Sequence, residues 1–569
     1  MIREYIGARY VPHFTGLYDN TQDYEALDVV DNGSGTSYIA KKPTPAGTPL
    51  TDTEYWFLYG SANGAIVNLQ NQINDIVSEI DLIHDKIVTP EMFGAVADGI
   101  TDDSGAFNDA IAKGDILILS GTYLIDTINI NKDLKIIGIG ATIKPAIVSG
   151  TLTLIKNAFT ISTASVSIDG VTFEGYGAYT GAVTERHSLI DCDDCASIII
   201  TNCTFKNIAS SYQNITQEGR FYIPILLKCV DVLKTNFNNN IIDTCYGDEL
   251  FVITPWFTIE DTVATFNDNI VNNIAAGASF NLMANYLEIN RNKFKDFNYS
   301  GSIFNMMCDD GYCNDNYFDN CTCGSVFDAC EDDSQYAKSL TVKNNIYRGI
   351  CKEFILQVGM YLYVVGNDIE AGALVYNALT SWDNNLQPPR MRNTFDRENG
   401  MIVIENNNVY LNNSQPGYII RLYSIGGHHA SDQPVSWYKK QNSLIIKNNT
   451  IKGKDFYTNK YMIQMLPLVS KIDCCYNIFN NPPKDAAAGS AKFLFTIDNR
   501  VVTEIIDMFN FNFNLMNNLD ASLTGGVLIG WVMDDHVTID MLNSIYNNPE
   551  NTQLNPGFTA TQYNTYNVL

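Results

Sequence analysis

A short phrase that recurs along the middle of the chain limits the possible folds most strongly. Between about residue 165 and residue 480, an apolar strand is followed by a small polar residue, one spacer, and then Phe or a branched aliphatic residue. Successive copies lie as little as 23 to 24 residues apart, and two later steps reach 40 and 42 residues. A short repeat with variable insertions predicts a β-solenoid in which each copy contributes one coil. The ten copies are Cys203-Thr-Phe205, Thr235-Asn-Phe237, Asp268-Asn-Ile270, Asn292-Lys-Phe294, Asn316-Tyr-Phe318, Asn344-Asn-Ile346, Asn367-Asp-Ile369, Asn407-Asn-Val409, Asn449-Thr-Ile451 and Asn477-Ile-Phe479.

The polar residue of the phrase is most often Asn, and this choice has a physical reason. At a solenoid corner, Asn tolerates unusual backbone angles, and its side chain can hydrogen-bond to its copy one coil away. We therefore interpret these Asn residues as structural. A β-propeller is less consistent with the spacing, because its blades would need four strands in each ~40–50 residues.

A second periodic pattern precedes the repeat. Apolar residues follow one another at spacings of 3, 4, 3, 4, 3 and 4 residues, which is an a/d heptad pattern. A single amphipathic helix on its own domain would show a wider apolar face with a period of 3.6 residues. The dominance of Ile disfavours two strands and shifts the preference to three or four, of which we predict three: a trimeric coiled coil over residues 63–87 and hence a homotrimer. Its members are Ile66, Leu69, Ile73, Ile76, Ile80, Ile83 and Ile87.

Charge and composition exclude several classes of function. The chain has 36 Lys and Arg against 63 Asp and Glu, with a net charge of -27, so nucleic acid and anionic membrane surfaces are unexpected partners. With 46% hydrophobic residues, the chain can bury a large core. No apolar run reaches the ~18 residues of a membrane span, and we expect neither membrane insertion nor a secretory signal peptide.

The cysteines are ambiguous between metal ligands and core residues. An odd count of 13 Cys over a long chain is a poor disulfide framework. Cys192-x-x-Cys195 suggests zinc, as does a later group, but no His lies near that group. We predict buried thiols instead, no metal site, and folding in a reducing cytosol. The later group comprises Cys308, Cys313, Cys321, Cys323 and Cys330.

Residues 1–62 read as a small β module. Short β-rich runs at 5–11, 27–30, 38–40 and 55–58 are separated by Gly- and Pro-rich turns. The aromatic residues of this module could form a shelf for sugars, but a small domain needs them for its core, which we favour.

A motif at 88–125 resembles the start of the right-handed β-helices of the pectate-lyase superfamily, especially phage tailspikes and related polysaccharide depolymerases. The matching residues are Phe93-Gly94-Ala95, Asp98-Gly99, Thr101-Asp102-Asp103 and Gly121-Thr122-Tyr123, over some 35 residues. Between them, Thr101 or Asp102 is a good helix N-cap, and Ala106, Phe107, Ala110 and Ile111 give one apolar helix face. In the family this motif caps the N-terminal end of the solenoid, so its Asp residues are interpreted as turn and cap residues.

Together with the repeat, the resemblance implies an all-β fold, a right-handed parallel β-helix over 88–500. Residues 501–569 lose the repeat and are predicted to form a C-terminal cap or trimer contact. The resemblance implies a tailspike or tail appendage subunit, located in the virion and assembled in the host cytoplasm. Its N-terminal module would attach to phage tail or baseplate proteins, and its β-helix would bind and depolymerise a bacterial surface polysaccharide. The alternatives are a receptor-binding spike without enzymatic activity and a free bacterial lyase or hydrolase.

Acidic turns on one edge of the solenoid are the first candidate site. Glycoside hydrolysis needs two carboxyl groups about 5–5.5 Å apart for retention and 6.5–9.5 Å for inversion. The acids of this edge recur about one coil apart, and long insertions beside them carry aromatic residues that can stack on sugars. A solvated acidic edge or a Ca²⁺ site would use the same residues. The predicted catalytic residues are Asp309, Asp310, Glu331, Asp332 and Asp333, and the predicted substrate-binding residues are Trp382, Trp437, Tyr438, His428 and His429.

A second cluster of mixed charge is the reserve candidate. Asp248 and Glu249 would be catalytic, with Arg220 and His187 binding a uronate or sulfate. Surface ion pairs are the alternative interpretation. Lyases of the family use Ca²⁺ or a basic residue to neutralise a uronate, whereas Gly426-Gly427-His428-His429 does not match the Gly-His-Gly signature of polygalacturonase-like relatives. That mismatch argues against pectin cleavage.

Overall fold

The computed structural model divides the chain into two compact units, 1–87 and 88–569, and each is described by itself. The described residues are 11–61, 69–77, 86–148, 154–155, 157–175, 188–208, 225–245, 250–254, 261–275, 280–298, 301–329, 337–380, 400–411, 419–424, 441–452, 461–465, 469–480, 493–497, 508–517, 527–531, 538–539, 542–546, 553–554, 559–560 and 563–565.

The first unit contains a four-stranded sheet in the order β1 (His13–Leu17), β2 (Asp28–Asp31), β3 (Thr36–Ala40) and β4 (Trp56–Ser61). Trp56 is buried and meets Tyr24 edge to face with ring centroids 5.3 Å apart. These two aromatic residues form the core, as predicted, whereas Phe57 and Tyr59 on β4 stay exposed. The run predicted at 5–11 lies almost entirely outside the described residues.

Part of the predicted coiled coil is described as a helix over residues 69–77. Its apolar positions Leu69, Ile73 and Ile76 are 58%, 50% and 54% exposed, so the chain does not cover them by itself. Ile66, Ile80 and Ile83 lie outside the described residues. Ile87, counted as the last heptad position, is part of the short strand β5 (Ile87–Val88).

The motif at 88–125 caps the second unit. It contains η1 (Pro90–Phe93), β6 (Asp98–Asp102) and α2 (Ser104–Lys113), and α2 buries the predicted face of Ala106, Phe107, Ala110 and Ile111. The N-cap position is Asp103, one residue beyond the prediction, and its carboxylate accepts the Val96 N–H over 2.7 Å. That carboxylate therefore serves the preceding turn.

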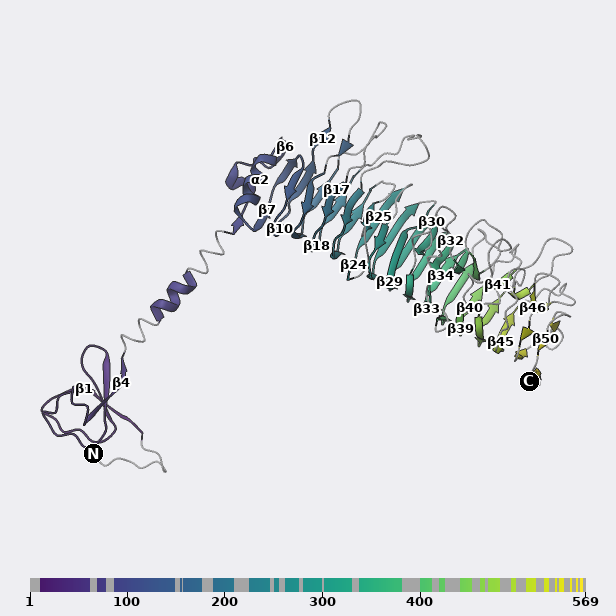
Figure 1. Ribbon diagram of the computed structural model, residues 1–569. Coiled ribbons are helices and arrows are strands. Elements are labelled where there is room, and N and C mark those ends of the chain that lie inside the picture. The colour runs from purple at the N-terminus through teal and green to yellow at the C-terminus, as the bar shows by residue number, and fades with distance from the viewer. Residues whose placement is uncertain are drawn as a thin grey trace, which may run out of the picture. The chain divides into compact units, whose positions relative to one another are not determined.

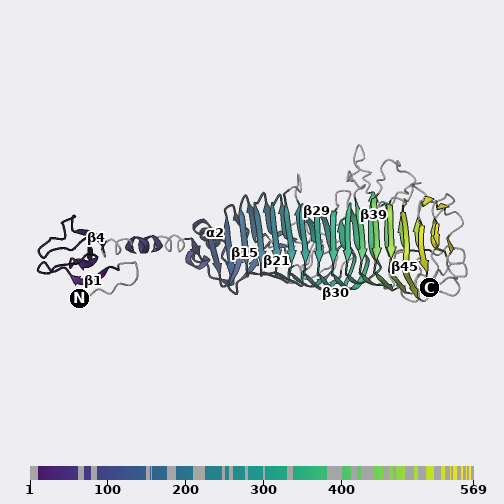
Figure 2. The ribbon, with the colours of Figure 1, turned by 90° about the horizontal axis from the view of Figure 1, so that it is seen from below.

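From β7 onward the chain winds into a right-handed parallel β-helix with three strand-bearing faces, as predicted (Figures 1 and 2). Each strand pairs in parallel with its counterpart on the coils before and after it. Four long strands turn a corner and serve two faces: β29 (Phe304–Asn314), β30 (Tyr317–Ala329), β32 (Ile346–Val358) and β45 (Met508–Asn517), whose end pairs with β43 on face 2. Two short pairs lie outside the faces, β12 (Ile147–Val148) with β13 (Leu154–Ile155) and β47 (Thr538–Ile539) with β50 (Thr559–Ala560).

Face 1 holds β7 (Ile116–Leu119), β10 (Leu134–Gly138), β15 (Ser165–Asp169), β18 (Ser197–Thr201), β21 (Lys234–Asn238), β24 (Val263–Asn267), β27 (Tyr286–Asn290), the end of β29, β31 (Ala337–Lys343), β33 (Tyr361–Val365), β36 (Met401–Glu405), β39 (Gln441–Lys447), β42 (Val469–Cys475), β45 (Met508–Asn517), β48 (Leu542–Tyr546) and β51 (Tyr563–Thr565). Face 2 holds β8 (Thr122–Ile125), β11 (Thr142–Pro145), β16 (Thr172–Glu174), β19 (Thr204–Lys206), β22 (Ile241–Asp243), β25 (Ile270–Ala275), β28 (Lys293–Asn298), the starts of β30 and β32, β34 (Asp368–Ala371), β37 (Asn408–Leu411), β40 (Thr450–Lys452) and β43 (Ile478–Asn480). Face 3 holds β9 (Ile128–Ile130), β14 (Phe159–Ser162), β17 (Ser188–Asp193), β20 (Ile225–Val230), β23 (Phe251–Thr254), β26 (Phe280–Met283), the start of β29, the ends of β30 and β32, β35 (Ala373–Thr380), β38 (Ile420–Ser424), β41 (Tyr461–Met465), β44 (Phe493–Ile497), β46 (Val527–Trp531) and β49 (Gln553–Leu554).

A ladder of buried Asn residues runs along the corner between faces 1 and 2. The Oδ1 atom of each accepts the backbone N–H of the ladder residue one coil earlier, and most ladder Asn side chains also donate Nδ2 to the next Oδ1. The predicted bond between copies is confirmed. The left-handed angle, however, belongs to the preceding residue, for example Arg291 and Asp315. The ladder consists of Asn240, Asn269, Asn292, Asn316, Asn345, Asn367, Asn407, Asn449, Asn477 and Asn514.

Three copies of the predicted phrase are misplaced against this ladder. Asp268 and Asn344 stand one residue early, at the left-handed positions before Asn269 and Asn345. Thr235 lies within β21 on face 1, where its spacing to Phe237 reproduces the phrase by ordinary strand alternation. The steps of 40 and 42 residues after Asn367 and Asn407 are confirmed.

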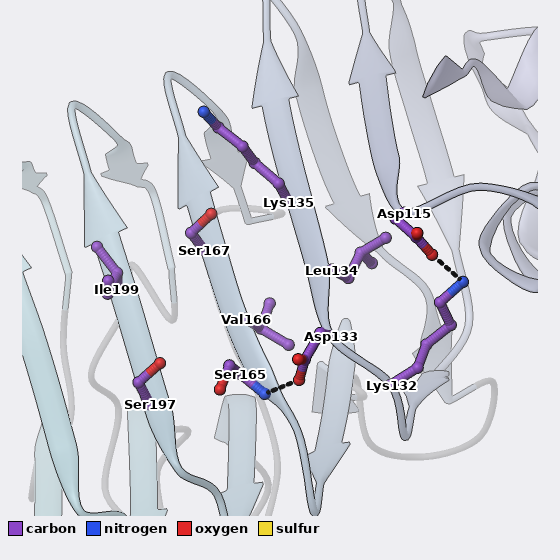
Figure 3. A pocket seen from close by; sticks show the side chains of 10 residues that line it. All are labelled: Asp115, Lys132, Asp133, Leu134, Lys135, Ser165, Val166, Ser167, Ser197 and Ile199. Carbon is purple, nitrogen blue, oxygen red and sulfur yellow. Dashed lines mark hydrogen bonds and ion pairs between the residues drawn. The ribbon is translucent and has the colours of Figure 1, made fainter. Parts of the chain in front are cut away.

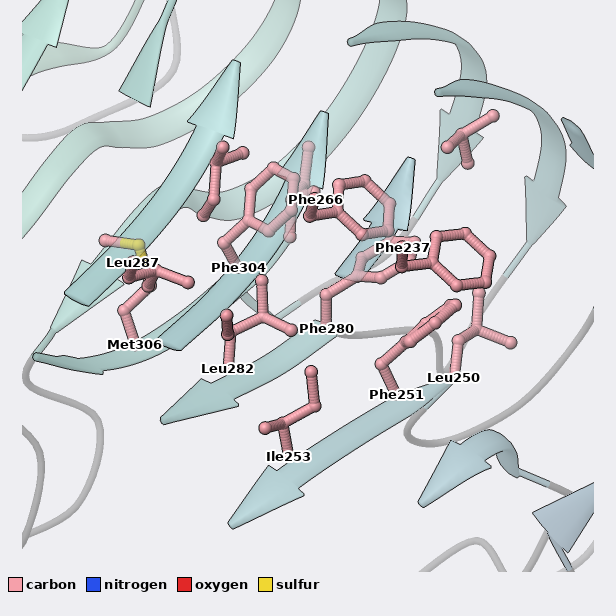
Figure 4. Packing of buried hydrophobic residues seen from close by; sticks show 14 of the residues in the cluster. Phe237, Leu250, Phe251, Ile253, Phe266, Phe280, Leu282, Leu287, Phe304 and Met306 are labelled. Carbon is pink, nitrogen blue, oxygen red and sulfur yellow. The ribbon is translucent and has the colours of Figure 1, made fainter. Parts of the chain in front are cut away.

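The core between the faces is a stack of aromatic and aliphatic residues with one layer per coil (Figure 4). Phe280, Phe304 and Phe327 occupy one column of face 3, with neighbouring ring centroids 5.4 and 5.7 Å apart. Burial of each such side chain contributes about 1.5–3 kcal/mol. The twelve described cysteines are buried free thiols, as the core interpretation predicted, and Cys330 lies outside the described residues.

The β-helix continues past residue 500, where the loss of the repeat predicted a C-terminal cap or trimer contact. β45 pairs in parallel with β42 and β43, and β48 pairs with β45. Asn514 extends the ladder by accepting from Asn477, although this coil lies 37 residues after the previous one. The repeat was missed here because Met516 stands where the phrase has Phe or a branched aliphatic residue.

Candidate functional site

The outer surface of face 1 presents side chains in two columns. On each strand the residues four and six positions before the ladder Asn point outward, and the parallel register stacks them coil upon coil. Because neighbouring strands lie roughly 4.7–4.9 Å apart, side chains in one column touch. A ligand lying along this face would therefore meet a regular array of side chains.

Four tyrosines and two carboxylates gather in these columns on β27, β29, β31 and β33. One column runs Tyr286, Asp310, Ser339, Tyr361, and the other runs Glu288, Tyr312, Thr341, Tyr363. We call Tyr286, Glu288, Asp310, Tyr312, Tyr361 and Tyr363 the tyrosine patch. The patch is made entirely of side chains on regular strands, so the stacked backbones fix its geometry.

Tyr286 and Tyr312 lie on the first two strands of the patch, with their rings close together. Their ring centroids lie 5.4 Å apart with planes inclined at 41°, and Tyr286 is 37% exposed. Gly311, between Asp310 and Tyr312, points inward, where a Cβ atom would lie 2.8 Å from the sulfur of Cys308. Because residues alternate along the strand, Asp310 and Tyr312 on either side of Gly311 face the outer surface.

Glu288 is anchored by two donors. The Tyr286 hydroxyl donates to Oε1 over 2.7 Å, and the Asn267 side-chain amide donates to Oε2 over 3.1 Å. The hydrogen bond to Glu288 is the main reason that the pKa of Tyr286 rises to about 12, with partial burial as the second cause. The phenol therefore stays protonated, and both oxygens of Glu288 are held in place.

Glu288 and Asp310 face the same side on adjacent strands, offset by two residues. The strand spacing and the rise per residue place their Cα atoms roughly 8 Å apart. Inverting glycosidases hold their two carboxyl groups ~6.5–9.5 Å apart, a separation that side chains extending from these two Cα positions can reach. Asp310 is exposed, and a sugar ring seated edge-on between the two groups would present one face to each, as inversion requires.

Of the predicted site residues, only Asp309 and Asp310 are described. They lie inside the continuous strand β29, and both N–H groups donate to the Asn285 carbonyl over 3.0 Å. They were predicted to stand in a turn, with Glu331, Asp332 and Asp333 about one coil away. The register instead places Ser339 beside Asp310 on the next coil and Tyr286 on the previous one. The remaining predicted residues lie outside the described part of the chain: Glu331, Asp332, Asp333, Asp248, Glu249, Trp382, Trp437, Tyr438, His428, His429, Arg220 and His187.

Other acids at or near the corner between faces 3 and 1 have structural roles. Asp194, Asp231 and Asp261 adopt left-handed backbone angles at the corner between faces 3 and 1. Asp191 pairs with Lys228 on the next coil over 3.1 Å. Among the described residues, no group of three or more His, Cys, Asp and Glu side chains is arranged to hold a metal ion.

The fold makes this chain a right-handed parallel β-helix protein. No family model matches it, and no curated protein matches it significantly. Solved structures similar to it include the A-module of mannuronan C-5 epimerase AlgE4 from Azotobacter vinelandii, with 13% identity, 78% of this chain and 97% of that module covered, and a TM-score of 0.37. An exopolygalacturonase from Thermotoga maritima has 13% identity, 76% and 92% coverage, and a TM-score of 0.32. The Dettilon tailspike protein has 16% identity, 79% and 68% coverage, and a TM-score of 0.27. At such identities the similarity concerns the fold alone.

No helix among the described residues has both the length and the apolar character needed to cross a membrane.

Proposed function

We propose that this chain is the subunit of a phage-type tailspike or tail appendage that binds a bacterial surface polysaccharide along face 1. The tyrosine patch is the observation that carries this proposal. Partly exposed tyrosine rings offer flat surfaces for sugar rings, and their hydroxyls and the two carboxylates offer partners for sugar hydroxyls. A regular column of such groups suits a polymer better than a small molecule.

Two further features support a spike-like assembly. The exposed apolar positions Leu69, Ile73 and Ile76 favour a homotrimeric coiled coil, since three helices would cover them. The sheet β1–β4 precedes this segment and is the part that would attach to tail or baseplate proteins. The protein would then act in the virion after assembly in the host cytoplasm.

A second candidate function is cleavage of the bound polysaccharide by inverting hydrolysis. The offset pair Glu288 and Asp310 supports it, with Asp310 as general acid and the anchored Glu288 as the base that activates water. The non-catalytic receptor-binding spike uses the same patch without this step.

Binding to a panel of purified capsular and cell-wall glycans tests the proposal. Tyr286→Ala and Tyr312→Ala should each weaken binding by about three- to tenfold, at the scale of a lost aromatic contact. The matched control is Tyr410→Ala, because Tyr410 on face 2 is also 37% exposed. Equal binding by all three variants would overturn the assignment of the patch. New reducing ends in the same reactions would separate the hydrolase from the non-catalytic spike, and absorbance of unsaturated uronates would reveal a lyase.

A further inference from the structure

An open hollow of about 550 Å³ lies on the outer surface of face 1, across the first coils of the β-helix (Figure 3). Its size falls within the ~300–1,000 Å³ of typical ligand pockets. It lies over β7, β10, β15 and β18, apart from the tyrosine patch on β27 to β33. We call it the serine hollow, and its lining residues are Asp115, Lys132, Asp133, Leu134, Lys135, Ser165, Val166, Ser167, Ser197 and Ile199.

Short hydroxyl side chains form the floor of the serine hollow. Ser167 stands between Lys135 and Ile199 in one outward column, and Ser165 is followed by Ser197 in the other. Each hydroxyl can both donate and accept a hydrogen bond. Leu134, Val166 and Ile199 add apolar surface, and this combination of hydroxyl groups with apolar contacts matches the surface of a sugar ring.

Of the two lysines that line the hollow, Lys132 pairs with a carboxylate, whereas Lys135 pairs with no described residue. Lys132 Nζ pairs with the Asp115 carboxylate over 2.7 Å and donates to the Gly114 carbonyl over 3.0 Å. Asp133 accepts the Ser165 N–H over 2.8 Å. Lys135 makes no ion pair with any residue that the structure describes, and in Figure 3 its ammonium group extends away from the Asp115–Lys132 pair.

We propose that the serine hollow is a second saccharide-binding site that takes an acidic sugar residue, with Lys135 binding its carboxylate and the serines its hydroxyls. A chain with a net charge of -27 repels an acidic polymer, and Lys135, a cation that pairs with no described residue, offsets that repulsion locally. Ser167 and Glu288 are separated by four strand steps, roughly 19 Å along the axis at the strand spacing. One polysaccharide chain along face 1 therefore reaches both the hollow and the tyrosine patch. The inference rests on the proposed function only in taking the ligand to be a polysaccharide.

Saturation-transfer NMR with the full chain tests this proposal. The probes are tetrasaccharides of polygalacturonate and polymannuronate, and the same tetrasaccharides after their carboxyl groups have been reduced to alcohols. Lys135→Gln should weaken binding of the acidic probes by about three- to tenfold, the scale of a charge-assisted contact at a partly exposed site, and leave the reduced probes unchanged. Lys135→Arg should retain most of the acidic binding. The matched control is Lys293→Gln, an exposed lysine on face 2.

Ser167→Tyr fills the hollow and should remove its contribution for acidic and reduced probes alike. Unchanged acidic binding in Lys135→Gln and Ser167→Tyr, while Tyr312→Ala still weakens it, would overturn the second site and leave the proposed function intact. Equal losses for acidic and reduced probes in Lys135→Gln would refute the choice of an acidic sugar. If the unmodified chain bound neither type of probe, the second site would be refuted and the glycan panel would decide the proposed function.

Discussion

The side-chain amide of Asn292 donates to Oδ1 of Asn316, its counterpart on the next coil, over 2.9 Å. The same Oδ1 atom accepts the backbone N–H of Asn292 over 3.0 Å, and Asn316 in turn donates to the Ile289 carbonyl over 2.8 Å. Both residues are essentially fully buried. One side chain therefore satisfies polar groups on two coils that have no access to water.

Asn316→Ala should destabilise the β-helix by about 2–5 kcal/mol, because it leaves buried donors and an acceptor unsatisfied. The change is measured as a lower thermal midpoint and as faster hydrogen exchange at the Asn292 amide. Asn408→Ala is the control, because the side chain of Asn408 donates a hydrogen bond to Asp368 one coil away but is exposed. This substitution should destabilise the fold by less than about 1 kcal/mol. Equal effects of the two substitutions would contradict the structural role of the ladder.

The Tyr286 hydroxyl should titrate at about pH 12. Because the folded-state pKa lies above the ordinary value of 10.0, the hydrogen bond to Glu288 stabilises the fold fully below pH 10 and loses that effect as the pH rises towards 12. The phenolate absorbance difference between the unmodified chain and Tyr286→Phe gives the pKa. Glu288→Gln should move it down towards the ordinary value, and an unmoved titration would show that Glu288 is not the cause.

The twelve described cysteines should be unreactive towards a thiol reagent at pH 8 in the folded protein. Burial raises the pKa of Cys203, Cys245 and Cys321 to about 12 and that of Cys308 further, so the thiolate population is negligible and the sulfur is inaccessible. Counting labelled thiols by mass spectrometry before and after denaturation measures this. Rapid labelling of Cys203 or Cys321 in the folded protein would contradict the packing described here.

Ile73→Asp should break the oligomer, because it places a charge in the apolar seam of the helix at 69–77. Light scattering should give about three times the chain mass of 63.4 kDa for the unmodified protein and a single chain mass for the variant. Gln72→Asp adds the same charge at a neighbouring exposed position and should leave the mass unchanged. A dimer in the unmodified protein would show that Ile at both seam positions does not select three strands here.

If the chain cleaves its polysaccharide, Asp310→Asn and Glu288→Gln should each lower turnover by about 10²–10⁴-fold. Glycan affinity should stay within a few-fold, because both substitutions preserve size and hydrogen-bonding capacity. Release of reducing ends measures turnover, and Asp368→Asn on the outer surface of face 2 is the control. If both patch variants kept full activity, catalysis would have to take place outside the tyrosine patch.

The repeat could be predicted from the sequence because the requirement that produces it acts within each coil. A buried corner needs a polar side chain that bonds its own copy, and this requirement leaves an Asn at each coil, as at Asn292, Asn316 and Asn367. The repeat was assigned wrongly at Thr235, because ordinary strand alternation gives the same pattern there. It was assigned one residue early at Asp268 and Asn344, because each is followed directly by the ladder Asn.

The tyrosine patch was missed although its signal is in the sequence. Counting back four and six positions from Asn292 gives Glu288 and Tyr286, and the same count from Asn316 gives Tyr312 and Asp310. The count works only after the ladder residue of each coil is fixed, because a one-residue error turns every side chain to the other side of the sheet.

The sequence by itself determined the solenoid, the capping helix at its start and the burial of the cysteines, because each depends on periodicity and polarity within one or a few coils. Only the tertiary structure decided that Glu288 stands beside Tyr312 and that Asp310 stands between Tyr286 and Ser339. These residues are 24 and more positions apart in the chain, and coils of unequal length bring them together. Their contacts depend on the register of stacked strands, which the backbone hydrogen bonds of the whole β-helix set at once.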